Sequence, residues 1–161
     1  MGQPEDKKPD FEDPLSDYSE TYADALEQAL SEEPVTAIQA QPFASVSPDT
    51  PISAAVELLS RLHVACLLVA DGDKLLGVFT DRDVLDRVAL EYDSVKDQPI
   101  STVMTPDPVF VYETDSTGAA LAVIAVSGHR HVPVLTLDGS VVGVVSPHRV
   151  TGFLQSVYET T

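Results

Sequence analysis

The chain has 161 residues, 43% of them hydrophobic, and its 26 acidic against 9 basic residues give a net charge of −17. This acidity argues against binding to nucleic acid or to an anionic membrane, because both attract clustered Lys and Arg. The apolar runs are too short to span a bilayer, and the N-terminus lacks the apolar stretch of a signal peptide. We therefore expect a cytoplasmic protein that contacts neither nucleic acid nor membrane.

The first 34 residues divide into two segments by composition. Residues 1–19 carry many acids, three prolines and little apolar content, which is typical of a disordered acidic tail. Residues 20–34 predict a short amphipathic helix that Pro34 ends, because apolar side chains recur at helical spacing. These side chains belong to Tyr22, Ala25, Leu26, Ala29 and Leu30.

The remaining sequence contains one unit twice, at a fixed offset of 66 residues. Gly77 corresponds to Gly143 (143 − 77 = 66) and Val84 to Val150 (150 − 84 = 66). A unit of this size buries too little apolar surface alone, so we expect two copies that share a core. We assign residues 35–91 to the first repeat and 92–161 to the second.

Each repeat is predicted to run β-α-β-β-α, which gives a mixed α/β (α+β) fold with pseudo-twofold symmetry. In the first repeat, apolar runs and helical periodicity predict strands at 43–46, 64–70 and 75–79 and helices at 52–62 and from 80 onward. In the second, they predict strands at 109–112, 132–136 and 141–145 and helices at 116–126 and 146–157. Residues 35–38 are expected to be extended and 92–99 to be a polar linker. The helix from Thr80 should turn Val84, Leu85, Val88 and Ala89 inward.

Two stretches of this pattern carry a family resemblance. The segment Gly77-Val78-Phe79-Thr80-Asp81-Arg82-Asp83 leaves the third strand of repeat one, and His131-Val132-Pro133-Val134 opens the middle strand of repeat two. Both resemble the cystathionine-β-synthase (CBS) domain, and two such domains in tandem resemble a Bateman module. The resemblance implies a disc-like regulatory module, commonly a homodimer, whose clefts bind adenosine-containing ligands such as AMP, ADP, ATP or S-adenosylmethionine.

Thr80 and Asp83 are the candidate ribose ligands. A hydroxyl and an ionised carboxylate suit a cis-diol, which offers two donors, and the carboxylate strengthens both hydrogen bonds. The same spacing resembles a capping box, which would only start a helix. The glycine at position 77 would let a ligand approach the backbone closely.

In the Bateman arrangement, the cleft that carries Asp83 is completed by repeat two. The resemblance therefore implies phosphate contacts from Arg130, His131 and His148 and an adenine pocket walled by Val78, Val109, Phe110 and Pro133. Basic residues gathered in an otherwise acidic chain agree with a phosphate pocket. Each of these residues also has a structural interpretation, as a solvated loop charge, a strand residue or plain core.

The second repeat differs at the position of the ribose acid, where Arg149 corresponds to Asp83 (149 − 83 = 66). Arginine has five donors and no acceptor, so it cannot accept hydrogen bonds from ribose hydroxyls. We expect the second diol site to be lost. The alternative is that Arg149 is a solvated helix residue.

The sequence thus predicts a regulatory sensor of adenine nucleotides that requires no cofactor and acts on a client protein. A ligand-free module for interaction or dimerisation, with the acidic tail and N-terminal helix docking a partner, is the alternative. A metal site built on His129, His131 and His148 lacks nearby acids or cysteines to complete it. Catalysis lacks a paired nucleophile and base, and Cys66 is expected to be a buried structural thiol.

Overall fold

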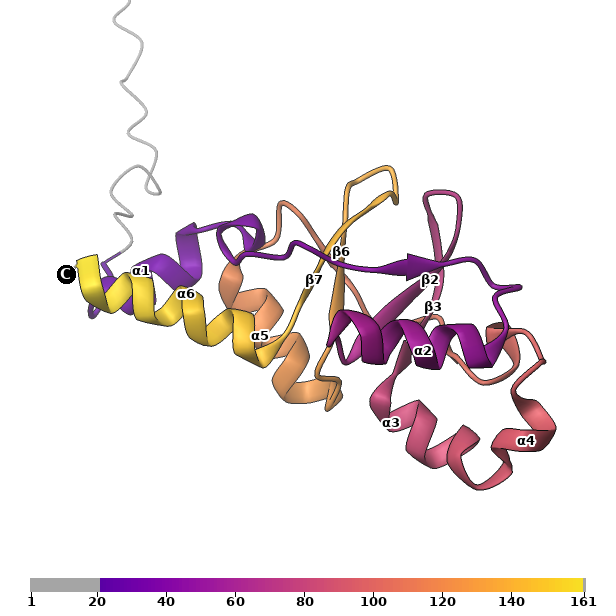
Figure 1. The fold of residues 1–161 in the computed structure, drawn as a ribbon. Coiled ribbons are helices and arrows are strands. Elements are labelled where there is room, and N and C mark those ends of the chain that lie inside the picture. Colours follow the sequence, from indigo (N-terminus) through magenta and orange to yellow (C-terminus); the bar gives the residue numbers. More distant parts are fainter. Residues whose placement is uncertain (1–20, 161) are drawn as a thin grey trace, which may run out of the picture.

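Two β-hairpins lie at the centre of the computed structural model, with helices at either end (Figure 1). The structure describes residues 21–160, so the tail expected at 1–19 lies outside the described residues. One four-stranded sheet has the order β1-β2-β3-β4 and one three-stranded sheet has the order β5-β6-β7. Among residues 21–160, no helix has both the length and the apolar character needed to cross a membrane.

The four-stranded sheet is built mainly by the first repeat, and its edge strand β4 comes from the start of the second. Its strands are β1 (Ser45–Val46), β2 (Cys66–Asp71), β3 (Lys74–Thr80) and β4 (Thr105–Pro106). Strand β1 is parallel to β2, whereas β2 with β3 and β3 with β4 are antiparallel. The helices of the first repeat are α2 (Ile52–Leu62), α3 (Asp81–Asp83), the π-helical η2 (Val84–Val88) and the 3-10 helix η3 (Ala89–Glu91). The helix α4 (Tyr92–Val95) and the 3-10 helix η4 (Ile100–Thr102) follow, between η3 and β4.

The second repeat has the same order of strands and helices in a simpler form. Its elements are β5 (Val111–Tyr112), α5 (Thr117–Ser127), β6 (Val132–Leu135), β7 (Val141–Val145) and α6 (Pro147–Thr160). Strand β5 is parallel to β6, and β6 is antiparallel to β7. The predicted fold class, a mixed α+β chain with two repeated units, is confirmed.

The paired glycines show how closely the repeats correspond. A Cβ on Gly77 would lie 2.6 Å from Met104 Sδ, and one on Gly143 would lie 2.5 Å from Ala40 Cβ. Gly77 pairs with Pro106 in β4, and the amide of Val144 donates to the Ala40 carbonyl at 3.0 Å. Both glycines therefore make room for a neighbouring segment of the chain. This differs from the expectation that Gly77 makes room for a ligand.

The N-terminal helix α1 (Ala25–Glu32) packs against the second repeat, on α5 and α6. Thr117 Oγ1 donates to the Ala29 carbonyl at 3.1 Å, and Ala29 and Leu30 pack against the second repeat's core. Part of the apolar face of α1, at Ala29 and Leu30, is therefore used inside the molecule, although no residue of α1 is fully buried. The 3-10 helix η1 (Val35–Ala37) follows where an extended piece was predicted, because turning the chain there buries both Val35 and Ile38.

Three clusters of buried side chains form the core. Among residues 21–160, one lies mainly in the second repeat and includes Val35 and Ile38, and one lies mainly in the first repeat and includes Ile100 and Val103. The third joins the repeats through Cys66, Leu68, Val78 and Val144. Burial of these apolar side chains is the main force that holds the two repeats together. The shared core expected from the size of the repeat is therefore present.

The helix after Thr80 differs most from its prediction. A continuous helix was expected, but α3 gives way to the π-helical turn η2 and the 3-10 turn η3. The wider turn changes which side chains face the core, so Val88 is buried whereas Leu85 is 71% exposed and Ala89 is exposed too. In the second repeat, α6 runs through the equivalent positions as a regular helix.

Candidate ligand-binding cleft

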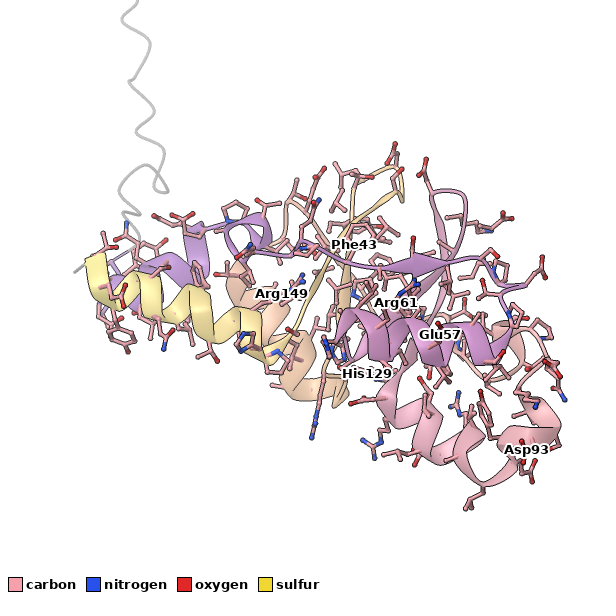
Figure 2. The ribbon with its side chains drawn as sticks, in the orientation of Figure 1. Phe43, Glu57, Arg61, Asp93, His129 and Arg149 are labelled. Carbon is pink, nitrogen blue, oxygen red and sulfur yellow. The ribbon has the colours of Figure 1, made fainter. Side chains whose placement is uncertain are left out.

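A cleft of about 680 Å³ lies between the two repeats, where β3 ends and α5 ends. Repeat one contributes the turn from β3 into α3 and η2, and repeat two contributes the connection from α5 to β6. Figure 2 shows His129 at the end of α5, and this residue lines the cleft. The lining residues are Val78, Thr80, Asp81, Arg82, Asp83, Leu85, Asp86, Arg87, Thr105, Ser127, Gly128, His129, Arg130 and His131.

The Asp83 carboxylate is the most constrained polar group of this cleft. Its Oδ2 accepts hydrogen bonds from the Thr80 amide and hydroxyl, both at 2.9 Å. The Asp83 amide donates in return to Thr80 Oγ1 at 3.3 Å, which completes a capping box at the start of α3. The residue is only 6% exposed, although it lines the cleft. The capping role weighed as an alternative is therefore present in the structure.

Two further residues hold the other oxygen of this carboxylate. Thr105 Oγ1 donates to Asp83 Oδ1 at 3.0 Å, and Arg87 Nη1 lies 3.4 Å from the same oxygen. Arg87 Nη1 also donates to the carbonyls of Val103 and Met104, both at 2.9 Å. Asp83 is thus tied, directly and through Arg87, to the start of the second repeat.

Sequence reasoning did not single out Arg87 or Thr105. Arg87 follows Asp83 by four residues, and a pair at this helical spacing could have indicated an ion pair. Thr105 is 22 residues from Asp83 in sequence, and no local pattern connects the two. Its contact depends on β4 joining the edge of β3, and β4 was not predicted.

Arg130 and His131 face this cleft from the second repeat. Arg130 is exposed and forms no ion pair with any residue between 21 and 160. Burial lowers the pKa of His131 below its usual value, the Asp81 carboxylate opposes this shift, and Arg130 and Arg149 add to it. The cleft therefore contains one permanent cation without a carboxylate partner beside a histidine that resists protonation.

Of the residues predicted to bind ligand, the structure brings Thr80, Asp83, Arg130, His131 and Val78 together around this cleft. Four others do not line it, and each has a clear position elsewhere. They are His148, exposed at the start of α6; Pro133, buried in β6 opposite Val144; and Val109 and Phe110, exposed before β5. The Phe110 ring packs edge-on against Tyr112, with ring centroids 5.3 Å apart.

The offset of the repeat explains the position of His148. It corresponds to Arg82 (148 − 82 = 66), and Arg82 lines the cleft from the first turn of α3. By pseudo-symmetry, His148 occupies the equivalent place at the start of α6 in the other repeat. Between residues 21 and 160, no group of three His, Cys, Asp or Glu side chains is placed to hold a metal ion.

Arg149 occupies the position of the ribose acid in the second repeat and makes specific contacts. Its Nη1 donates to the Val144 carbonyl at 2.8 Å, and its Nη2 donates to the Pro42 carbonyl. Figure 2 shows Arg149 at the start of α6, and Phe43 on the chain segment that contains Pro42. Burial lowers the pKa of Arg149. The alternative that Arg149 is a solvated helix residue is therefore wrong, because its guanidinium joins the second repeat to the segment before β1.

Cys66 lies behind the cleft, opposite Thr80 in the β2–β3 hairpin. Burial raises the pKa of its thiol to about 12, with further contributions from the Asp83 and Asp81 carboxylates. A thiol with such a pKa carries almost no thiolate near neutral pH, and the thiolate is the reactive form. The expectation of a buried structural thiol is confirmed.

Comparison with known proteins supports the resemblance seen in the sequence. The family model of the CBS domain matches twice, at residues 35–90 and 100–156. The chain is 28% identical over 118 residues to the CBS domain-containing protein CBSCBSPB3 of Arabidopsis thaliana, covering 73% of this chain and 21% of that protein. It is 29% identical over 102 residues to the inosine-5'-monophosphate dehydrogenase of Thermoplasma acidophilum, and the match covers 63% of this chain and 20% of that protein.

The fold is also similar to solved structures. The crystal structure of CBSX2 in complex with AMP superposes with a TM-score of 0.64 at 26% identity, covering 73% of this chain and 91% of that chain. The chain spans about a fifth of the length of the Arabidopsis relative it matches. With two matched domains across most of its length, the chain belongs to the CBS domain family, as a tandem pair of CBS domains.

Proposed function

We propose that this CBS pair is a regulatory module that binds an adenine nucleotide in the cleft between its repeats. The observation that carries the proposal is the arrangement of charges across that cleft. A buried carboxylate of the first repeat, Asp83, and a guanidinium of the second repeat without a carboxylate partner, Arg130, line the same cavity. A nucleotide offers its ribose diol to the Asp83 carboxylate and its phosphate to the Arg130 guanidinium. CBSX2, which is 26% identical, was crystallised with AMP.

In this proposal, Thr80 and Asp83 bind the ribose, Arg130 and His131 bind the phosphate, and Val78 contacts the adenine. Arg130 is suited to phosphate because its planar guanidinium donates two parallel hydrogen bonds. His148, Val109, Phe110 and Pro133 would join the site only if ligand binding moved them toward it. The Thr80 hydroxyl already donates to Asp83, so it would act mainly by holding the carboxylate.

Binding of a diol would change the contacts that Asp83 makes. A carboxylate has about four lone-pair positions for hydrogen bonds. Thr80 uses two of them and Thr105 a third, while Arg87 lies beside the same oxygen as Thr105. Two ribose donors therefore cannot both bind unless Thr105 and Arg87 both give way. The contacts with Thr80 belong to the helix cap and would be the harder ones to release.

This competition suggests how occupancy would be transmitted. Through Arg87 and Thr105, Asp83 holds residues 103–105, which lie at the start of the second repeat and lead into β4. A ligand that displaces Arg87 and Thr105 would release this segment and change how the repeats are held together. A client protein that binds one arrangement better than the other would then respond to the nucleotide.

Calorimetry on the purified chain tests the proposal. We expect AMP to bind the wild type with a stoichiometry near one per chain, and Asp83→Asn to lose most of this affinity because the amide accepts only through one oxygen. Asp93→Asn is the matched control, since Asp93 is exposed on α4 at the far end of the molecule (Figure 2). Equal binding by wild type and Asp83→Asn would contradict the ribose role. Absence of binding by AMP, ADP, ATP and S-adenosylmethionine would leave the interaction module as the better account.

A specific feature also favours self-association. Helix α5 is apolar on nearly every side, and its outer face exposes Ala122, Ala125 and Val126, the last with 88% of its surface accessible. An apolar helix face in contact with water favours burial against another protein. We propose a homodimer that covers this face. Sedimentation equilibrium should show a dimer that Val126→Glu dissociates, and a wild-type monomer at all concentrations would contradict this assembly.

A further inference from the structure

Most charges around the cleft neutralise each other within the first repeat. Arg82 Nε lies 3.6 Å from Asp86, and Arg87 lies 3.4 Å from Asp83. Within residues 21–160, two lining side chains of opposite sign have no ion-pair partner, Asp81 and Arg130. Asp81 accepts only one hydrogen bond there, from the amide of Arg82 at 2.8 Å.

Asp81 and Arg130 line this cleft from different repeats, Asp81 at the start of α3 and Arg130 just before β6, next to His131. The Asp81 carboxylate raises the pKa of His131, but burial lowers it by more, and Arg130 and Arg149 lower it further. His131 is therefore mostly neutral near pH 7. Beside His131, the cleft therefore presents a guanidinium, Arg130, and a carboxylate, Asp81, neither of which has an ion-pair partner among residues 21–160.

From this arrangement we propose that the cleft selects adenine nucleotides by the charge of their phosphate tail, and that Asp81 rejects additional phosphates. Arg130 provides for one phosphate. The β- and γ-phosphates of ATP would bring further negative charge toward Asp81, with no second unpaired cation to receive it. The net charge of −17 opposes polyphosphates as well. The inference rests on the proposed nucleotide site and makes AMP the preferred ligand over ATP.

The test is calorimetry with adenosine, AMP and ATP, without Mg²⁺, at about pH 7.5 and about 0.15 M salt, where surface charges are partly screened. We expect the wild type to bind AMP at least about tenfold more tightly than ATP. Asp81→Asn should narrow this ratio to about threefold or less by tightening ATP, while adenosine affinity stays unchanged. Asp93→Asn changes the net charge equally but lies outside the cleft, so it should keep the wild-type ratio.

Different results would overturn different conclusions. The selectivity would be overturned if ATP bound as tightly as AMP, or if Asp81→Asn kept the wild-type ratio of AMP affinity to ATP affinity. Either result would leave the nucleotide site in place. An equal narrowing in Asp93→Asn would assign the effect to net charge rather than to Asp81. Failure of every adenosine compound to bind would overturn the proposed site, and the inference with it.

Discussion

Thr105 and Asp83 are joined by a 3.0 Å hydrogen bond from the Thr105 hydroxyl to the carboxylate, although 22 residues separate them in sequence. Thr105 begins β4 and follows directly on the carbonyls that Arg87 binds. The carboxylate proposed to bind ribose is therefore attached to the chain segment at the start of the second repeat. This attachment makes the segment a competitor of the ligand.

Replacing Thr105 should separate stability from ligand affinity. We expect Thr105→Val to lower the free energy of unfolding by about 1 kcal/mol, because a partly buried hydrogen bond is lost. AMP should bind this variant more tightly than the wild type, since one competing donor is absent. Chemical denaturation and calorimetry measure the two effects. Thr151→Val removes an exposed hydroxyl from α6 and should change neither the free energy of unfolding nor AMP affinity. Weaker AMP binding by Thr105→Val would contradict the competition between Thr105 and ribose for Asp83.

Arg149 should contribute to stability rather than to ligand binding. Arg149→Met removes the donors to the Val144 and Pro42 carbonyls, and we expect a loss of about 1–2 kcal/mol in the free energy of unfolding. Arg61→Met, on the exposed face of α2 (Figure 2), is the control and should change stability by less than about 0.5 kcal/mol. Urea denaturation compares them. Equal stability of both variants would show that the two carbonyl contacts contribute nothing.

Cys66 should be unreactive in the folded protein. Its pKa of about 12 and its burial leave neither thiolate nor access for a thiol reagent at about pH 8. We expect Ellman's reagent to modify Cys66 only after unfolding in denaturant, at a rate that follows the unfolding transition. Rapid modification of the native protein would mean that the β2–β3 hairpin behind the cleft opens readily.

The pH dependence of stability should depend on His131. Its pKa in the folded state is lowered, chiefly by burial, so the unfolded chain binds the proton more readily. Stability is therefore complete above the unfolded pKa of about 6.5 and decreases as the pH falls below it. Thermal denaturation between about pH 8 and pH 5 should show this decrease, and His131→Gln should reduce it. His63→Gln, at the exposed residue that follows α2, serves as the control. An unchanged slope in His131→Gln would contradict the assignment.

The elements predicted most accurately are those with a strong local pattern. The helix predicted at 52–62 and the strand predicted at 141–145 have the observed bounds of α2 and β7. Apolar spacing along each segment is sufficient to define both elements. The two-residue strand β4 was missed because it depends on pairing with β3, and the π-helical turn η2 was missed because no apolar periodicity marks it.

Part of the candidate site was predicted, namely the part that a local sequence pattern marks. The Thr80-x-x-Asp83 spacing and the basic stretch at 130–131 are visible in the sequence, and both line the cleft. The placement of His148 could have been corrected from the sequence, because the 66-residue offset relates it to Arg82 rather than to the basic stretch. The contacts of Arg149 with Val144 and Pro42 could not have been predicted from the sequence, since they depend on how the repeats pack.

The central claim is that one nucleotide binds between the repeats, and amide chemical shifts on titration with AMP test it most directly. The account predicts that the amides of Thr80, Asp83, Thr105, Arg130 and His131 shift together and saturate at one AMP per chain. Shifts confined to the start of α6, or saturation at two AMP per chain, would place the ligand elsewhere and contradict it.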